Sequence, residues 1–192
     1  MHVETLYSTH KVEETDEKTG AVTITEVKEV IGYVERTKRT VRYFRDLDGK
    51  ILHREDGPAY IDLETGTEIW YRNGEKHRDG DQPAFTSPTM YQWYVDGKRH
   101  RVGGPAVKHR DSDYCAYYIN DRLHRVGGPA VVYDNGDVAY YYDGHFVVGI
   151  TENGAADLGP CIDTLKEWGS YRDMIVSESI QNAEESEPIS QP

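Results

Sequence analysis

Four histidines recur along the middle of the chain, and an arginine follows each of them. The pairs are His53-Arg54, His77-Arg78, His100-Arg101 and His124-Arg125, with steps of 24, 23 and 24 residues. Imidazole is the commonest protein ligand of transition metals, and arginines interleaved with tyrosines bind single-stranded nucleic acids. The motif therefore raises two chemical possibilities, a metal ladder and a nucleic-acid surface.

A metal site needs ligands that converge to about 2 Å from one ion. Equivalent histidines of successive repeats are separated by a whole hairpin pair, and no cysteine or carboxylate stands at a fixed offset to complete a tetrahedron. We therefore expect neither a metal nor another cofactor. Each imidazole is instead expected to pack on an aromatic partner and to bond the backbone of the Gly-Pro bend.

The motif arginines alternate to the face opposite the histidines. There they can form salt bridges with nearby carboxylates or stack on tyrosine rings, and we favour this structural use. The nearby carboxylates are those of Glu55, Asp56, Asp79 and Asp81. If the arginines were exposed in register, they would form a basic stripe, which keeps single-stranded nucleic-acid binding open as an alternative.

Catalytic patterns are absent from the sequence. Neither Cys115 nor Cys161 has a fixed local base, and no phosphate-binding glycine loop is present. The Gly103-Gly104-Pro105 and Gly127-Gly128-Pro129 steps are interpreted as bends. We expect no catalytic residues and no enzyme.

The elements that must position the motif are β-hairpins. Turn dipeptides precede the His-Arg pairs, and Asn-Gly and Asp-Gly between strand-forming residues are the strongest short hairpin signal. Counting across two-residue turns places an aromatic residue opposite each histidine: Phe44 opposite His53, Trp70 opposite His77, Trp93 opposite His100, and Tyr117 opposite His124. The turns are Asp48-Gly49, Asn73-Gly74, Asp96-Gly97 and Asn120-Asp121, with a fifth at Asp143-Gly144.

A proline and an alanine follow each His-Arg pair, at Pro58, Pro83, Pro105 and Pro129. Proline lacks an N–H and belongs at a strand start or an edge, which fits a bend between units. The predicted fold is all-β. It is a tandem β-hairpin repeat array that forms a single meandering antiparallel sheet, with an N-terminal hairpin cap and a short C-terminal helix.

The chain is expected to have four segments. Residues 1–40 form the hairpin cap, with strands over 3–14 and 21–36, and residues 41–150 hold four units and a terminal half unit that ends in an apolar run. Residues 151–176 form a capping segment with a helix over 161–176. Residues 177–192 are rich in Ser, Glu, Gln and Pro and are expected to be disordered.

The charge and composition of the chain limit the classes of partner that it is expected to bind. The formal net charge is -12, and residues 151–192 have 2 basic and 9 acidic side chains, so the acidity lies mainly in the tail. An acidic chain repels nucleic acid. No apolar stretch approaches the length of a membrane span or of a signal peptide, and there are only 2 cysteines, so we expect no membrane partner and a cytoplasmic location, which is the host cytoplasm if the protein is viral.

The recurring unit, Trp/Tyr-Tyr-x-Asn/Asp-Gly-x-x-His-Arg-x-x-Gly-Pro-Ala, resembles a hairpin repeat of uncharacterised phage, giant-virus and bacterial proteins, and it is similar to the MORN repeat. The resemblance covers residues 41–150. It implies a hairpin array and brings no catalytic residues.

The chain has 15 Tyr against 3 Phe and 3 Trp, and Tyr, Trp and Arg are enriched at binding hot spots. We therefore expect a protein-binding module. Residues 86–92 and 108–114 depart most from the repeat and are interpreted as loops that carry either recognition or neutral drift. Nucleic-acid binding and self-association are the alternatives. The candidate binding residues are Tyr91, Tyr94, Arg110, Tyr114, Tyr118 and Tyr141.

Overall fold

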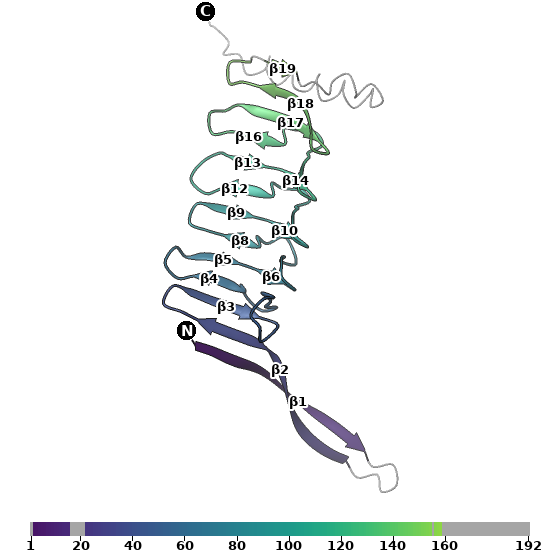
Figure 1. Cartoon of the computed structure of the whole chain (residues 1–192). Helices are drawn as coiled ribbons and strands as arrows, with labels where there is room; N and C mark the ends of the chain where they lie inside the picture. Colours follow the sequence, from purple (N-terminus) through teal and green to yellow (C-terminus); the bar gives the residue numbers. More distant parts are fainter. Residues whose placement is uncertain (1, 16–21, 155, 159–192) are drawn as a thin grey trace, which may run out of the picture. The chain divides into compact units, whose positions relative to one another are not determined.

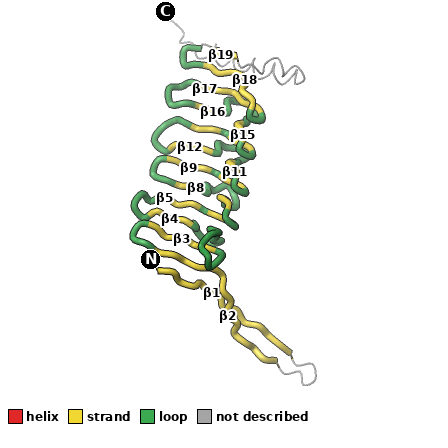
Figure 2. The backbone as a smooth tube through the Cα atoms, in the orientation of Figure 1, coloured by secondary structure: helices red, strands yellow, loops and turns green. Residues whose placement is uncertain are grey.

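The computed structural model describes residues 2–15, 22–154 and 156–158, and every regular element in these ranges is a β-strand (Figure 2). The chain divides into two compact units. Unit 1 comprises residues 1–78 and 84–87, and unit 2 comprises residues 79–83 and 88–192. The helix expected over 161–176 and the disorder expected over 177–192 lie outside the described residues.

Unit 1 contains a main antiparallel sheet of six strands in the order β1-β2-β3-β4-β5-β8, and the hairpin β6–β7 forms a separate two-stranded sheet (Figure 1). The strands are β1 (His2–Thr15), β2 (Val22–Arg36), β3 (Thr40–Phe44), β4 (Tyr60–Asp62), β5 (Thr67–Ile69), β6 (Tyr71–Arg72), β7 (Glu75–Lys76) and β8 (Phe85–Thr86).

Unit 2 repeats this arrangement with a main sheet in the order β9-β12-β13-β16-β17-β18-β19 and the separate hairpins β10–β11 and β14–β15. The strands are β9 (Met90–Gln92), β10 (Tyr94–Val95), β11 (Lys98–Arg99), β12 (Val107–His109), β13 (Cys115–Ala116), β14 (Tyr118–Ile119), β15 (Arg122–Leu123), β16 (Val131–Val132), β17 (Val138–Tyr142), β18 (His145–Ile150) and β19 (Ala156–Leu158).

Four of the five predicted turns have positive φ at both central residues, as a type I′ turn requires, whereas at Asp48-Gly49 only Gly49 does. Asn73 and Gly74 have φ of 50° and 85°, and Asp143 and Gly144 have φ of 48° and 84°. The turn at residues 120 and 121 contains no glycine, yet its Asn and Asp have φ of 51° and 64°. Asn and Asp tolerate this left-handed region better than other non-glycine residues, which explains the turn composition.

Each repeat of the array bends at the aromatic residue before its short hairpin. In unit 2 the Trp93 N–H donates to the Ala106 carbonyl at 2.8 Å, and the Trp93 carbonyl accepts from the His100 N–H at 3.1 Å. The strand therefore leaves the main sheet at this residue and pairs with its own second arm. This is why the short hairpins form two-stranded sheets of their own beside the main antiparallel sheet. The all-β array of hairpins that the sequence predicted is confirmed.

The alanine of each Pro-Ala step is fully buried at this bend. Ala59, Ala84, Ala106 and Ala130 all have 0% exposure, and each accepts the N–H of the aromatic residue at 2.7 to 2.8 Å. A larger side chain has no room there. The backbone pairing of His77, His100 and His124 with the residues expected opposite them is confirmed by bonds of 3.0 to 3.2 Å to Trp70, Trp93 and Tyr117.

The first hairpin differs from the prediction by one residue. The His53 N–H bonds the Tyr43 carbonyl at 3.0 Å, and Phe44 pairs with Leu52, so the expected pair of Phe44 and His53 is wrong. The cause is Asp46, whose carboxylate accepts the backbone N–H groups of residues 50 and 51 at 3.3 and 2.8 Å. These bonds begin the loop two residues before the Asp48-Gly49 turn.

The N-terminal hairpin expected over residues 1–40 is present as β1 and β2. Only Tyr33–Arg36 of β2 pairs with β3, so the rest of β2 pairs with β1 alone. At the base of this hairpin Glu35 is buried and forms an ion pair with Arg42. At the other end of the chain, the sheet of unit 2 continues past residue 150 because β18 pairs with β19.

The best-buried part of unit 2 lies in its last strands. Tyr140, Val147 and Val148 form one buried cluster, within the apolar run that the sequence indicated as a cap. A second cluster of Val107, Ala116, Val131 and Ala139 lies across four strands. This second cluster supports the surface described next.

Candidate partner-binding surface

In all four repeats the motif arginine covers the ring of the aromatic residue whose carbonyl accepts the histidine N–H. Among the histidines, His124 packs on a different ring, that of Tyr142, at 4.6 Å between centroids. Each guanidinium carbon lies at van der Waals distance above an aromatic ring, and all four arginines are half-buried. The distances are 4.1 Å for Arg54 and Tyr43, 4.0 Å for Arg78 and Trp70, 3.9 Å for Arg101 and Trp93, and 4.0 Å for Arg125 and Tyr117. We call this contact the arginine stack.

In three of the four repeats the glycine before the proline lies against the arginine stack, whereas Pro83 follows Gln82 and Arg78 stacks on Trp70 without such a glycine. A Cβ placed on Gly104 would lie 2.9 Å from the Arg101 Cζ, which no side chain tolerates without movement. Arg101 also donates to the Pro105 carbonyl at 3.3 Å and to both carboxylate oxygens of Asp81 at 2.6 and 2.8 Å. The guanidinium thus lies between a glycine backbone and an indole ring, and the His-Arg and Gly-Pro-Ala signatures belong to one structural device.

The histidines connect one hairpin to the turn of the next. The Nδ1 of His53 accepts the Asn73 N–H at 3.1 Å, and the Nδ1 of His124 accepts the Asp143 N–H at 3.1 Å. His100 Nδ1 lies 3.0 Å from the Asn120 side-chain oxygen. Within the described residues, no group of three or more His, Cys, Asp or Glu is arranged to hold a metal ion.

Arginine–carboxylate pairs on the short hairpins add to these contacts in unit 2. The Nε of Arg99 donates to the Asp121 carboxylate at 2.8 Å, and Arg122 donates to both Asp143 oxygens at 2.8 and 2.9 Å. Burial alone would lower the pKa of Arg99, but its bond with Asp121 and the neighbouring Tyr118 hold that pKa above its usual value.

The two segments that depart from the repeat lie side by side in unit 2. Of the segments 86–92 and 108–114, residues 90–92 and 108–109 lie in paired strands with Tyr91 opposite Lys108, whereas residues 87–89 and 110–114 lie outside the strands. The Arg110 N–H donates to the Thr89 carbonyl at 2.9 Å, and the Arg110 guanidinium lies 4.2 Å from the Tyr91 ring. Tyr91 and Arg110 therefore contact each other.

Three other candidate residues gather on one surface. Tyr114, Tyr118 and Tyr141 are half-buried and pack against the Val107, Ala116, Val131 and Ala139 cluster together with Phe146. Tyr114 also contacts the His109 ring at 4.6 Å and the Tyr133 ring at 6.2 Å between centroids. The tyrosine surface is defined by His109, Tyr114, Tyr118, Tyr133, Tyr141 and Phe146.

Strand register separates Tyr91 from the tyrosine surface. Tyr91 aligns across the sheet with Lys108, Cys115 and Val132, whereas the supporting cluster aligns with Gln92. Neighbouring residues of a strand point to opposite faces, so Tyr91 lies on the other face. Tyr94 belongs to the hairpin beside Arg99, and its hydroxyl donates to the Gln92 side chain at 2.7 Å.

The tyrosine rings are close enough to influence one another. Burial raises the pKa of Tyr114, and the neighbouring Tyr118 and Tyr133 raise it further. Burial also raises the pKa of Tyr141, again with contributions from Tyr133 and Tyr118. These phenols stay protonated at neutral pH and can donate hydrogen bonds to a partner.

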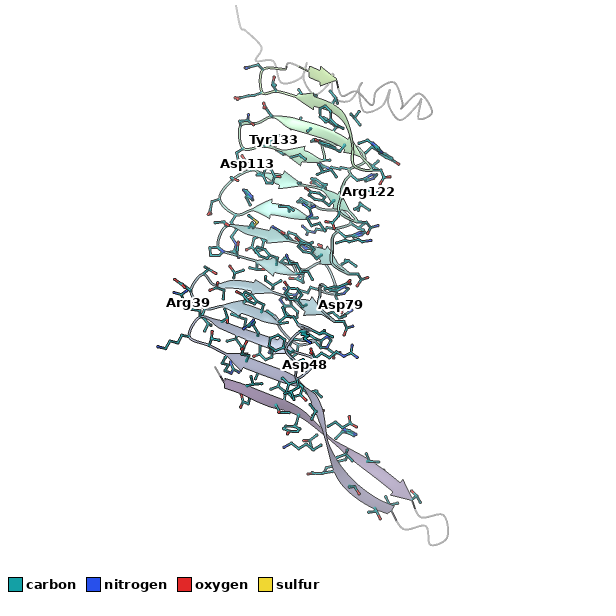
Figure 3. All side chains as sticks on the ribbon, in the orientation of Figure 1. Arg39, Asp48, Asp79, Asp113, Arg122 and Tyr133 are labelled. Carbon is teal, nitrogen blue, oxygen red and sulfur yellow. The ribbon has the colours of Figure 1, made fainter. Side chains whose placement is uncertain are left out.

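The rim of the tyrosine surface is acidic. Within the part of the chain that the structure describes, the carboxylates of Asp113, Asp134 and Asp137 form no ion pair, although Asp134 accepts the Tyr114 N–H at 2.8 Å. Figure 3 shows Asp113 and Tyr133 at the same edge of unit 2 and Arg122 at the opposite edge. Uncompensated carboxylates beside exposed rings favour a basic partner.

Sequence reasoning missed His109, Tyr133 and Phe146. Tyr133 is 40% exposed and lies two residues after the buried Val131, so the alternation of the strand could have placed it on the same face. His109 carries the same signal, since it lies two residues after the buried Val107 of its strand. Phe146 carries no such signal, because the strand register shifts beside its partner Tyr141.

Among the residues that the structure describes, no helix has the length and hydropathy of a membrane span. Comparisons of the chain with protein-family models, with curated proteins and with solved structures give no match.

Proposed function

We propose that the chain is a protein-binding module without catalytic activity and that its partner binds the tyrosine surface of unit 2. The observation that carries the proposal is the packing of half-exposed rings on a floor of small and branched side chains, Val107, Ala116, Val131 and Ala139. Tyrosine combines a large apolar area with a polar tip and few rotatable bonds, which suits binding surfaces.

The acidic rim supports a partner with a basic contact region. Asp113 and Asp134 are exposed, and no described lysine or arginine pairs with them. A basic partner would gain attraction at the rim while its apolar side chains cover the rings. The motif arginines, by contrast, are held in the arginine stacks, so the surface of the array is not the regular basic stripe that single-stranded nucleic-acid binding needs.

The test compares two faces of the same sheet. The full chain is used to capture a partner from its natural cell, and the purified partner is then titrated against Tyr133→Ala and Tyr91→Ala variants. Tyr133→Ala should weaken binding by tenfold or more, since central aromatic residues are frequent hot spots. Tyr91 lies on the opposite face of the sheet, so Tyr91→Ala should leave the affinity unchanged.

Thermal denaturation of both variants is the control for folding. Because Tyr133 is 40% exposed and belongs to neither buried cluster of unit 2, its truncation should change the unfolding temperature little. Strong loss of binding in Tyr91→Ala with full binding in Tyr133→Ala would refute the assignment of the face. Equal affinity of all three chains would refute the tyrosine surface as the binding site.

A further inference from the structure

The N-terminal hairpin leaves one long strand edge open. β1 is the end strand of the main sheet of unit 1, and among the described residues it pairs only with β2 (Figure 1). It has 14 residues and contains no glycine or proline, and the extra residue of the bulge, Ile31, lies in β2. An open edge of this kind has unpaired backbone N–H and C=O groups to which another strand can add.

The strands behind β1 show which of its residues have the free backbone groups. The Tyr43 N–H donates to the Ala59 carbonyl, and the Tyr43 carbonyl accepts from the His53 N–H, so the backbone of Tyr43 faces away from β2. Tyr43 aligns with Val34, and Val34 aligns with Glu4. Because backbone groups alternate between the two sides of a strand, Val34 faces β1 and Glu4 faces β2. The odd-numbered residues of β1 therefore have their N–H and C=O groups at the open edge.

Beyond the main sheet, the hairpin is a two-stranded ribbon without a core. Residues 7–15 of β1 pair with residues 22–30 of β2 alone, and none of the ribbon side chains that the structure describes is buried. Tyr7, Ile24 and Val30 are 48%, 57% and 53% exposed. A ribbon of two strands is marginally stable in water, and three or more strands are needed for independent stability. More strands at the β1 edge would supply this support.

We infer that β1 pairs antiparallel with β1 of a second copy of the chain, with Tyr7 opposite Tyr7 of that copy. A two-fold axis perpendicular to the sheet relates the two strands, so the same edge is used in both copies. Odd-numbered residues then face odd-numbered residues, and their free backbone groups form two hydrogen bonds for each such pair. From Val3 to Lys11 the contact gives roughly ten hydrogen bonds. The contact joins the two hairpins into one continuous sheet.

The side chains of the hairpin match across this register. Tyr7 is opposite Val30 within the hairpin, so Val30 and Tyr7 of both copies form one apolar row across the joined sheet. On the other face, Glu4 lies opposite His10 of the second copy, which can donate a hydrogen bond to it. No two like charges are opposite each other in this register. A shift of the centre by one residue would place Tyr7 opposite Thr9 and break the apolar row.

The open edge of β2 is a poorer match for a second copy. It ends where β3 begins to pair, at Tyr33. Val27 is opposite His10 and so faces β1, which leaves the backbone of Glu26 at the β2 edge. A contact centred in the middle of this edge would place Glu26 opposite Glu26 of the second copy, and like charges directly opposite each other are destabilising.

Proline substitution tests the edge separately from the fold. Thr9→Pro removes a backbone N–H at the β1 edge, and proline is tolerated at the edge of a sheet. Glu26→Pro is the matched control, because it removes an N–H at the β2 edge. In sedimentation velocity the wild-type chain and Glu26→Pro should form a dimer as the concentration is raised, whereas Thr9→Pro should have a dissociation constant at least tenfold higher. Circular dichroism of each variant checks that the strands remain.

Charge substitution tests the register. His10→Glu places a glutamate opposite Glu4 at both ends of the contact and should raise the dissociation constant about tenfold. Adding Glu4→Lys to the same chain should bring the constant back to within about threefold of wild type, because opposite charges then face each other. Both residues are exposed, so the hairpin itself should be unaffected. This rescue tests the inference even if Thr9→Pro disrupts the hairpin.

Four results would overturn the inference. They are a wild-type chain that is monomeric at every concentration, equal dimerisation of Thr9→Pro and the wild type, loss of the dimer in Glu26→Pro alone, and no rescue of His10→Glu by Glu4→Lys. The tyrosine surface is tested apart from this contact. Tyr133→Ala should leave the dimer unchanged, and loss of the dimer in that variant would place the contact between copies in unit 2 and refute pairing at the β1 edge.

Discussion

Replacement of Gly104 by alanine tests the arginine stack directly. The backbone at Gly104 has no left-handed φ, so the substitution introduces no backbone strain of that kind. The new Cβ would instead lie 2.9 Å from the Arg101 Cζ and 3.0 Å from its Nε and Nη1. Because these atoms are at the far end of a flexible side chain, the guanidinium can relieve the overlap by leaving its place between Gly104 and the Trp93 ring.

The cost follows from the contacts that Arg101 would lose. A partly desolvated cation–π contact contributes about 1 to 2 kcal/mol, and the hydrogen bond to the Pro105 carbonyl about 1 kcal/mol. The ion pair with Asp81 adds less than about 1 kcal/mol because the Asp81 side chain is 64% exposed. Complete loss of these contacts would cost about 2 to 3 kcal/mol, so Gly104→Ala should destabilise unit 2 by up to this amount, measured by urea denaturation with tryptophan fluorescence as the probe.

A double-mutant cycle decides whether the arginine is the cause. Arg101→Ala removes the group that the new methyl would meet, so Gly104→Ala should cost little in that background. Gly103→Ala is the matched control, since Gly103 has φ of 77° with open space around it and its cost of about 1 to 2 kcal/mol should not depend on Arg101. An equal cost of Gly104→Ala with and without Arg101 would refute the arginine stack as the reason for the glycine.

Three further experiments in unit 1 test other parts of the fold by chemical or thermal denaturation. Glu35→Ala leaves Arg42 without its buried partner and should cost about 2 to 3 kcal/mol, whereas Glu64→Ala removes an exposed ion pair and should cost less than about 1 kcal/mol. Asn73→Ala should be about 1 kcal/mol less stable than Asn73→Gly, because only glycine adopts φ near 50° without strain. Backbone N–H groups lower the pKa of Asp62 in the folded chain, so its contribution is present above the unfolded value of about 3.9 and is lost as pH falls through the lower folded pKa. Asp62→Asn should thus reduce the stability difference between pH 7 and pH 3, and an unchanged difference would show that the carboxylate has no such role.

The fold could be predicted from the sequence where local chemistry determines it. The type I′ turns follow from Asn and Asp followed by Gly, and they set the backbone partner of the histidine in three hairpins. The first hairpin could not be predicted in this way, because Asp46 accepts two backbone N–H groups and moves the loop. Such a bond depends on a side-chain rotamer that a count of residues across a turn does not contain.

The candidate surface was only partly predictable for a similar reason. Strand alternation groups Tyr114 with Tyr133, but it takes the register of paired strands to separate Tyr91 from them. The sequence predicted that the motif arginines would stack on tyrosine rings or pair with nearby carboxylates, and both contacts are present. It did not predict which ring each arginine covers, since cross-strand counting pairs that aromatic residue with histidine. Arg101 lies beyond the hairpin, where the chain folds back over the ring of Trp93.

The contact between each histidine and the following turn gives a counting rule for arrays of this kind. His53 holds the turn at Asn73, and His124 holds the turn at Asp143. A histidine is useful only when another turn follows it, so the number of His-Arg pairs should be one less than the number of turns. The chain obeys this rule, because it has four His-Arg pairs and five turns. The last turn, Asp143-Gly144, has no His-Arg pair after it. A further 24-residue repeat at this end would therefore need a new His-Arg pair after that turn.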